Sequence, residues 1–166
     1  MDAVVTGTFE PASARKKQKE SFMAQVSASS SIQLAAAPEV VLTALADYET
    51  VRPRILTEHY RDYRVISGGR GDGTVVHWIL QATEKRQRDV QATVSVKGST
   101  VTETDANSTL VTTYSVVPNG TGSTVVVLTQ WKGAGGVKGF FEKTFAPLGL
   151  KKIQQQVLEN LKKEVD

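Results

Sequence analysis

The fold is decided by residues 25–48, which read QVSASSSIQLAAAPEVVLTALADY. Apolar side chains alternate with polar ones from Gln25 to Leu34, and this period of two predicts a strand with one buried face. Pro38 is a favoured first residue of a helix and opens a short amphipathic segment over 38–48. The domain therefore begins with a half-buried strand that runs directly into a short helix.

Short segments rich in β-branched and aromatic residues follow, after a second short helix or turn over 51–56. The pattern predicts strands over 60–67, 74–86, 89–97, 100–104, 110–117 and 124–132. We expect the strand over 100–104 to be short and exposed. The turn sequence PNGTG at 118–122 is a strong hairpin signal, and connections this short make neighbouring strands antiparallel.

The chain ends in a long amphipathic helix, expected over 137–165, with a kink or break at Pro147 and Gly149. Only this helix is long enough to cover the inner face of the sheet. We therefore predict an α+β fold of the helix-grip kind. A curved antiparallel sheet of about six to seven strands wraps around the C-terminal helix, two short helices follow the first strand, and an apolar cavity remains between the layers.

The length of 166 residues suits one domain with a real core. Residues 1–24 contain a basic run and few large apolar side chains, so we expect a flexible N-terminal extension before a single ligand-binding domain over 25–166. The sequence has no apolar run of membrane-spanning length and no secretory-signal pattern. We therefore expect a cytoplasmic protein, and the sequence leaves its oligomeric state open.

Charge and composition narrow the range of partners. The formal net charge is +3, from 20 Lys and Arg against 17 Asp and Glu. A nucleic-acid binder usually shows a denser basic face, so no nucleic-acid partner is expected. The sequence has no cysteine, and its two histidines are too far apart for a local metal pattern, so we expect no metal and no cofactor.

A family resemblance is carried by three segments, namely Ser27–Val41, Ala46–Tyr48 and Phe140–Val165. Together they resemble the START-like helix-grip superfamily (SRPBCC), in the style of its small actinobacterial members. This superfamily includes the birch-pollen allergen type and the bacterial polyketide cyclase/dehydrase and lipid-transport group. The sequence departs from the family pattern at Glu49–Arg54, where a Pro-x-Trp type of segment is usual. The resemblance implies binding of a hydrophobic small molecule such as a lipid, quinone or polyketide, and no particular reaction.

The side chains expected to line the cavity are mostly apolar or aromatic, as is usual for small-molecule sites. The candidate ligand-binding residues are Trp78, Leu80, Val94, Tyr114, Leu128, Trp131, Phe141, Phe145 and Leu148. The Tyr114 hydroxyl is a candidate for orienting an oxygen of the ligand, although the ring also suits ordinary strand packing.

Three functions remain open at this point. The leading one is non-catalytic binding or transport of a hydrophobic small molecule, because the sequence shows no paired acid and base. The alternative is a polyketide cyclase, aromatase or dehydratase, with His77 and Tyr114 as candidate catalytic residues. His77 lies on a strand whose two faces both begin apolar, so it serves as a base only if it faces the helix. The third is a protein-interaction module with a collapsed core and no ligand.

Overall fold

The computed structural model of the chain describes residues 25–132 and 147–166. Along these residues lie the elements β1 (Gln25–Leu34), α2 (Pro38–Ala46), α3 (Arg52–Ile55), β2 (Tyr60–Ser67), β3 (Val75–Thr83), β4 (Arg86–Lys97), β5 (Thr100–Asp105), β6 (Val111–Asn119), β7 (Gly122–Lys132) and α5 (Pro147–Val165). The order of elements is the one predicted from the sequence. The expected extension 1–24 and the expected helical residues 137–146 lie outside the described residues.

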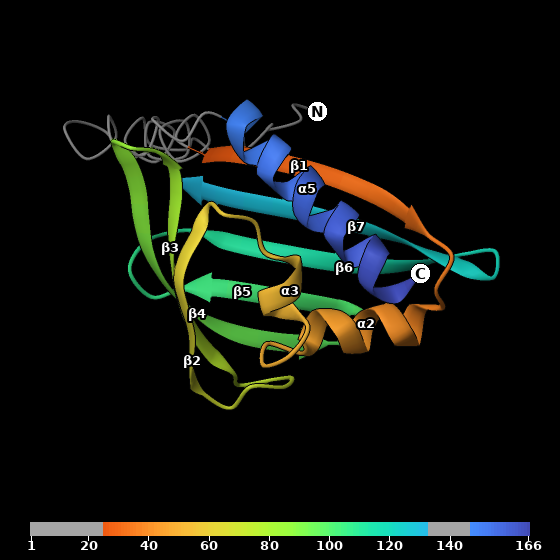
Figure 1. Cartoon of the computed structure of the whole chain (residues 1–166). Helices are drawn as coiled ribbons and strands as arrows, with labels where there is room; N and C mark the ends of the chain where they lie inside the picture. Colours follow the sequence, from red (N-terminus) through yellow and green to blue (C-terminus); the bar gives the residue numbers. More distant parts are fainter. Residues whose placement is uncertain (1–24, 133–146) are drawn as a thin grey trace, which may run out of the picture.

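The seven strands form one antiparallel sheet in the order β1-β7-β6-β5-β4-β3-β2. Strands β2 to β7 pair with their sequence neighbours, as short turns require. Strand β1 instead pairs with β7 over its whole length, from Gln25 opposite Lys132 to Leu34 opposite Ser123. Figure 1 shows the sheet curving around α5. This arrangement confirms the predicted α+β helix-grip fold.

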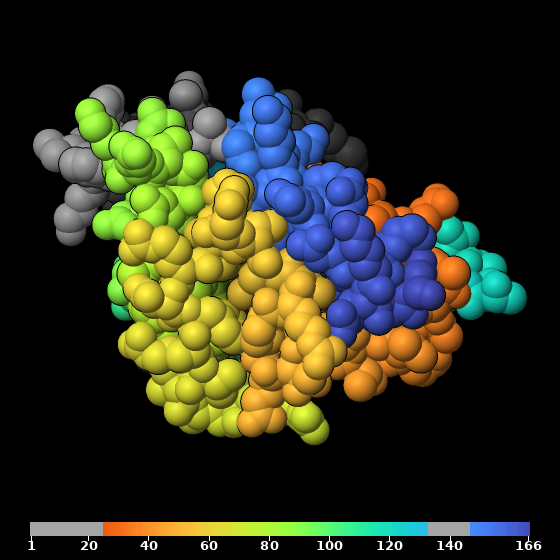
Figure 2. Space-filling model, in the orientation of Figure 1, coloured from red at the N-terminus to blue at the C-terminus, as the bar shows by residue number. Residues whose placement is uncertain are grey.

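Helix α5 crosses the inner face of the sheet diagonally (Figure 1). Its buried side chains recur at spacings of three and four, so they share the face that meets the sheet. They are Leu150, Ile153, Gln154, Val157, Leu158 and Leu161. Helices α2 and α3 cover the rest of this face, and Figure 2 shows the atoms of α3 and α5 side by side. In the described part of the chain, no helix is both long enough and apolar enough to span a membrane.

Strand β5 differs from the sequence expectation, which made it exposed. It lies in the middle of the sheet, between β4 and β6. Val101 is 0% exposed, and Glu103 and Asp105 are also buried. The prediction was wrong because the frequent polar residues suggested a solvated strand. In the structure Glu103 shares the inner face with Val101, since alternate side chains of a strand point the same way.

The connection between β1 and α2 is fixed by side chains from two distant parts of the chain. Ser123 Oγ donates a hydrogen bond to the carbonyl oxygen of Ala36 at 2.7 Å. The Asp166 carboxylate accepts hydrogen bonds from the backbone N–H groups of Ala35 and Ala36, each at 3.1 Å. These bonds fix the point at which the chain leaves the sheet, and with it the position of α2 and α3 over the inner face.

Candidate functional site

Two narrow spaces lie inside the molecule between the sheet and α5, with volumes of about 20 Å³ and about 10 Å³. Both are bounded by Leu80, Leu110 and Leu150, so they are neighbouring parts of one region, which we call the interior space. The larger part has room for about one water molecule. Its wall is apolar except for a set of polar side chains, which are Tyr60, Glu103, Thr112, Tyr114, Thr129 and Gln154.

A buried ion pair stands at one end of the interior space. Arg52 Nη1 of α3 lies 3.3 Å from Glu103 Oε1 of β5, and the two side chains are only 1% and 7% exposed. The Tyr48 hydroxyl donates a hydrogen bond to the same Oε1 at 2.7 Å. We call Arg52, Glu103, Tyr48 and Tyr114 the ionic cluster. It ties the segment after α2 to the centre of the sheet.

Within the ionic cluster, Arg52 is shielded from the interior space by aromatic rings. Its guanidinium carbon lies 4.4 Å from the ring centroid of Tyr48 and 4.9 Å from that of Tyr114. Its Nη2 donates to the carbonyl oxygen of Leu45 at 2.6 Å, which satisfies one of the last carbonyls of α2. Arg52 is not part of the wall of the interior space, whereas Glu103 and Tyr114 are. The space is therefore bordered by the negative end of the ion pair.

Glu103 uses its two oxygens differently. Oε1 accepts the hydrogen bond from the Tyr48 hydroxyl and forms the ion pair with Arg52. Oε2 has no hydrogen-bond partner among residues 25–132 and 147–166. A carboxylate oxygen carries lone pairs for more than one donor, and Glu103 borders the interior space. The wall of the interior space therefore offers an unused acceptor.

The tyrosines beside this acceptor keep their protons. Burial raises the pKa of Tyr114 to about 12, with Glu103 adding to the rise and Arg52 opposing it. Burial also raises the pKa of Tyr60 well above its ordinary value, again helped by nearby negative charge. The Tyr60 ring packs edge-on against Trp78, with the ring centroids 5.9 Å apart. At neutral pH both phenols are therefore hydrogen-bond donors in the wall, next to the acceptor Glu103.

A second polar group, which we call the neutral ladder, joins α5 to the sheet. Gln154 Nε2 donates to Ala28 O at 3.1 Å and to Thr129 Oγ1 at 3.0 Å. Thr129 Oγ1 in turn lies 2.9 Å from Thr112 Oγ1. The Ser30 hydroxyl donates to Gln154 Oε1 at 3.2 Å. Every member is thus hydrogen-bonded, and the ladder fixes α5 across β1, β7 and β6.

The structure brings some of the predicted ligand-binding residues together and separates others. Trp78, Leu80 and Tyr114 line the larger part of the interior space, and Trp131 lines the smaller part. Val94 is 1% exposed and packs in the core away from both parts. The candidates Phe141 and Phe145 lie outside the described residues.

Two predicted residues lie away from the interior space. Leu128 is opposite Ser29 of β1, on the outer face of β7, because its neighbours Val127 and Thr129 point inward. Leu148 is 74% exposed at the start of α5. Their assignment to the cavity was therefore wrong. Each residue lies next to inward-facing positions of its own element but points away from the interior space.

His77 also faces away from the helix. The inner residues of β3 are Val76, Trp78 and Leu80, which leaves His77 on the outer face, although it is only 7% exposed. Its Nδ1 lies 3.1 Å from Asp62 O, and its Nε2 lies 3.1 Å from Asp89 Oδ1. The prediction of His77 as a base acting in the cavity is therefore wrong. The sequence could not decide this, because both faces of β3 carry apolar residues.

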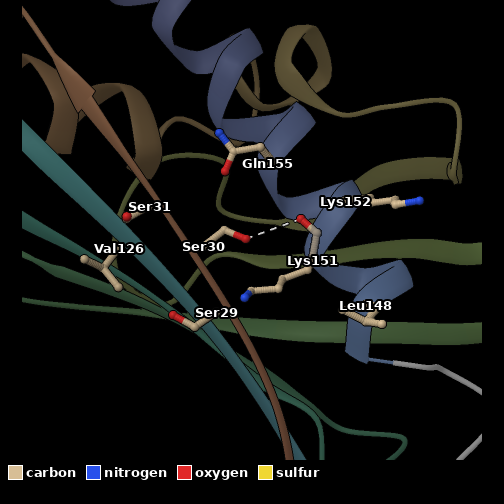
Figure 3. A pocket seen from close by; sticks show the side chains of 8 residues that line it. All are labelled: Ser29, Ser30, Ser31, Val126, Leu148, Lys151, Lys152 and Gln155. Carbon is tan, nitrogen blue, oxygen red and sulfur yellow. Dashed lines mark hydrogen bonds between the residues drawn. The ribbon is translucent and has the colours of Figure 1, made fainter.

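An open groove of about 790 Å³ lies outside the core, between the edge strand β1 and the first turns of α5. Figure 3 shows Lys151 reaching toward the serines of β1, while Lys152 points away from them. Ser30 Oγ lies 3.3 Å from the carbonyl oxygen of Lys151 and 3.2 Å from Gln154 Oε1, so these two acceptors share its single hydrogen. Leu148 lies in this groove. The groove is larger than the interior space. The buried polar side chains, however, converge on the interior space, which is therefore the better candidate site.

The residues that sequence reasoning missed are Arg52 and Glu103. Arg52 precedes Pro53 in a segment read as an interruption of a helix, and Glu103 lay in the strand read as exposed. One signal for Glu103 was present in the sequence. It lies two positions after Val101, so the two side chains point to the same face of the strand. Its partner Arg52 gave no signal, since a charged residue in a short connection is normally solvated. In the described residues no group of three or more His, Asp or Glu is placed to hold a metal ion.

A curved antiparallel sheet that holds a long helix over an interior space defines the helix-grip superfamily, which includes the birch-pollen allergen type. Residues 25–166 match the family described as polyketide cyclase / dehydrase and lipid transport, and the chain belongs to this family. This membership confirms the resemblance noted in the sequence. No curated protein matches the sequence.

Solved structures with the same fold range from near to distant. The NMR structure of the KanY protein (ms6282) is 62% identical, with a TM-score of 0.79, and the match covers 85% of this chain and 97% of that one. TTHA0849 from Thermus thermophilus is 14% identical, with a TM-score of 0.70 and coverage of 84% and 97%. The di-domain ARO/CYC BexL from the BE-7585A biosynthetic pathway is 12% identical, with a TM-score of 0.67 and coverage of 93% and 55%. The last two matches establish the fold alone.

Proposed function

We propose that this protein binds a small hydrophobic molecule in the interior space between the sheet and α5. The observation that carries the proposal is the wall itself. Apolar side chains such as Leu80, Leu110 and Val127 surround it, while Glu103 and Tyr114 converge at one end. A few polar groups on an apolar wall are typical of sites that fix the orientation of a small molecule. Membership of a family that includes lipid transport supports the same function.

Binding requires the interior space to expand. Its two parts measure about 20 Å³ and about 10 Å³, whereas ligand sites usually have roughly 300–1,000 Å³. Leu150 borders both parts and belongs to the first turns of α5. We therefore expect a ligand to separate Leu150 from Leu80 and Leu110 and to displace the start of α5 from the sheet.

Native mass spectrometry of the gently purified protein, followed by extraction of bound small molecules, tests this function. A second test compares two variants in NMR titrations with the extracted compound or with naphthol. Leu110→Phe fills the interior space and should abolish the shifts, at a cost in stability of about 1–3 kcal/mol from overpacking. Val117→Phe places the same ring on the exposed side of β6, where the valine is 49% exposed, and should leave binding unchanged.

A ligand-free mass, together with no shifts in the wild-type protein, would overturn the proposal. That result would favour the protein-interaction alternative, which predicts a collapsed interior. Binding that survives Leu110→Phe and is lost in a Leu148 or Lys151 variant would move the site to the open groove between β1 and α5.

A second candidate function is a cyclase-type reaction, which the pairing of Glu103 with protonated tyrosines favours. Glu103 borders the interior space, so its carboxylate is placed to take a proton from a carbon next to a ligand carbonyl. Tyr60 or Tyr114 would donate a hydrogen bond to the enolate oxygen that forms. The fold of the di-domain ARO/CYC BexL supports this candidate at the level of architecture.

Deuterium exchange next to the carbonyl of a slowly exchanging ketone such as tetralone tests the second candidate. In D₂O the wild-type protein should accelerate the exchange followed by NMR, and Glu103→Gln should abolish the acceleration. Glu159→Gln removes the same charge from the exposed face of α5 and is the matched control. Binding of the ketone without any acceleration would exclude the reaction and leave the carrier function in place.

A further inference from the structure

The polarity of the interior space selects the chemistry of the ligand, if the binding function proposed above holds. Glu103 Oε2 is an acceptor without a partner in the described part of the chain, and it belongs to a side chain that is 7% exposed. Glu103 borders the interior space, and a ligand donor that pairs with its carboxylate forms a charge-assisted hydrogen bond, so a ligand that brings a donor gains more than one that does not. The acceptor therefore distinguishes between ligands of similar shape.

The positive partner of Glu103 does not compensate for this. Arg52 does not border the interior space; its guanidinium lies over the rings of Tyr48 and Tyr114, and its Nη2 is already bound to Leu45 O at 2.6 Å. A ligand in the interior space meets Glu103 directly and Arg52 only through Tyr114. A ligand carboxylate at this end would therefore face a like charge in a site from which water is excluded.

The other end of the interior space differs in charge. Arg88 borders its smaller part beside Leu110 and Trp131, and the Arg88 Nη1 donates to Ser108 Oγ at 3.4 Å. The interior space is therefore polar at both ends, and among residues 25–132 and 147–166 Glu103 is the one carboxylate that borders it. The tyrosine hydroxyls in the wall add donors next to the acceptor, an arrangement that matches a group which both donates and accepts.

We propose that the ligand carries an alcohol or phenol hydroxyl that donates to Glu103 Oε2 and accepts from Tyr60 or Tyr114, and that ethers and carboxylates bind less well. A hydroxyl group satisfies both kinds of partner at once. An ether offers only an acceptor, and a carboxylate offers only acceptors together with a charge. The preferred class is thus a neutral hydroxylated apolar molecule rather than a fatty acid.

Calorimetric titration of the full chain with naphthol, its methyl ether and naphthoate tests the inference at neutral pH. The three probes share one ring system and differ in the polar group. Naphthol should bind about tenfold more tightly than either of the others, since only naphthol can donate a hydrogen bond to the Glu103 carboxylate. Equal or tighter binding of the ether or of naphthoate would overturn the inference and leave the binding function intact. If none of the three binds, the proposed function itself fails.

Variants locate the preference in Glu103. Arg52→Met combined with Glu103→Gln removes both charges together, so no buried charge is left alone, and the preference for naphthol over its ether should fall to about twofold or less. Glu159→Gln removes an exposed carboxylate and should keep the tenfold preference. If the folded double variant keeps the preference, another group binds the ligand hydroxyl, and the assignment of this role to Glu103 is overturned.

Discussion

The ionic cluster and the neutral ladder are both polar groups buried under the same helices, yet they differ in how completely they are satisfied. In the neutral ladder every side chain makes at least one hydrogen bond across α5 and the sheet, for example Gln154 with Thr129. In the ionic cluster Arg52 Nε has no partner in the described part of the chain, and one oxygen of Glu103 is unused. The ladder is thus complete in itself, and the cluster is not.

The difference indicates different roles. A fully satisfied network of neutral groups fixes the position of α5, and any other molecule would have to break it. A buried ion pair contributes little to stability compared with an apolar pair of the same size. Stability therefore does not explain the ion pair, and we look to specificity or function for its role. We therefore assign the ladder to the fold and the cluster to the site, and the following predictions test that division.

The largest effect is expected from Arg52→Leu. The change leaves Glu103 as an uncompensated buried charge, so the free energy of unfolding should fall by about 3–5 kcal/mol. Urea denaturation measures the loss. Arg54→Leu is the matched control, because Arg54 is 59% exposed and pairs with Glu164 at the surface, and it should cost about 1 kcal/mol or less. Similar losses in the two variants would contradict the assignment of a buried ion pair.

A smaller effect is expected from Tyr48→Phe. The substitution keeps the ring over Arg52 and removes only the hydrogen bond to Glu103 Oε1. A hydrogen bond to a charged group contributes about 2 kcal/mol, so unfolding should become easier by that amount. Because the Glu103 carboxylate then has one donor fewer, the preference for naphthol over its ether should grow rather than shrink. Calorimetry on the folded variant checks the sign.

Gln154→Leu should lower stability and, although Gln154 borders the interior space, should keep the preference between the probes. It removes the hydrogen bonds to Ala28 O and Thr129 and should lower the free energy of unfolding by about 1–2 kcal/mol. Since the change lies in the neutral ladder, the tenfold preference for naphthol should survive. Loss of that preference in a folded Gln154→Leu protein would show that the two polar groups are not separate.

The smallest effect concerns Asp166, an exposed carboxylate that serves as a reference for the buried one. Hydrogen bonds from Lys162 and from the backbone of Ala35 and Ala36 hold the pKa of Asp166 below its ordinary value. Its contribution to stability is therefore present above the ordinary carboxyl pKa and is lost as the pH falls through the lowered value. Asp166→Asn should be slightly less stable at neutral pH, and its difference from the wild-type protein should shrink as the pH falls through the lowered pKa of Asp166. Denaturation of both proteins over a series of acidic pH values measures the convergence.

Most of the fold followed from local patterns. The alternation over Gln25–Leu34, the glycine-rich turn at 68–73 and the PNGTG hairpin each specify local geometry, and the strands and α2 lie close to their predicted positions. The pairing of β1 with β7 was not predicted, because about a hundred residues separate the two strands and no short turn joins them. Among the strands, β5 was misjudged, because its polar composition outweighed its alternation.

The site followed much less well. Trp78, Leu80, Tyr114 and Trp131 could be placed on inner faces because strand periodicity is local. The ionic cluster could not, since Tyr48 and Glu103 are 55 residues apart and neither looks buried in its own segment. The segment Glu49–Arg54, which departs from the family pattern, supplies Arg52 to the cluster. Neither that departure from the family motif nor either histidine predicted a buried Arg52.

The positions of the tryptophans make the interior space optically accessible. The chain contains two tryptophans, Trp78 and Trp131, and both lie in the wall of the interior space, 6% and 1% exposed. Indole emission shifts with the polarity of the surroundings, so the whole tryptophan signal of this protein originates where a ligand would sit. The unmodified chain therefore carries its own reporter, and a spectrum taken during purification shows whether the interior is dry, wet or filled.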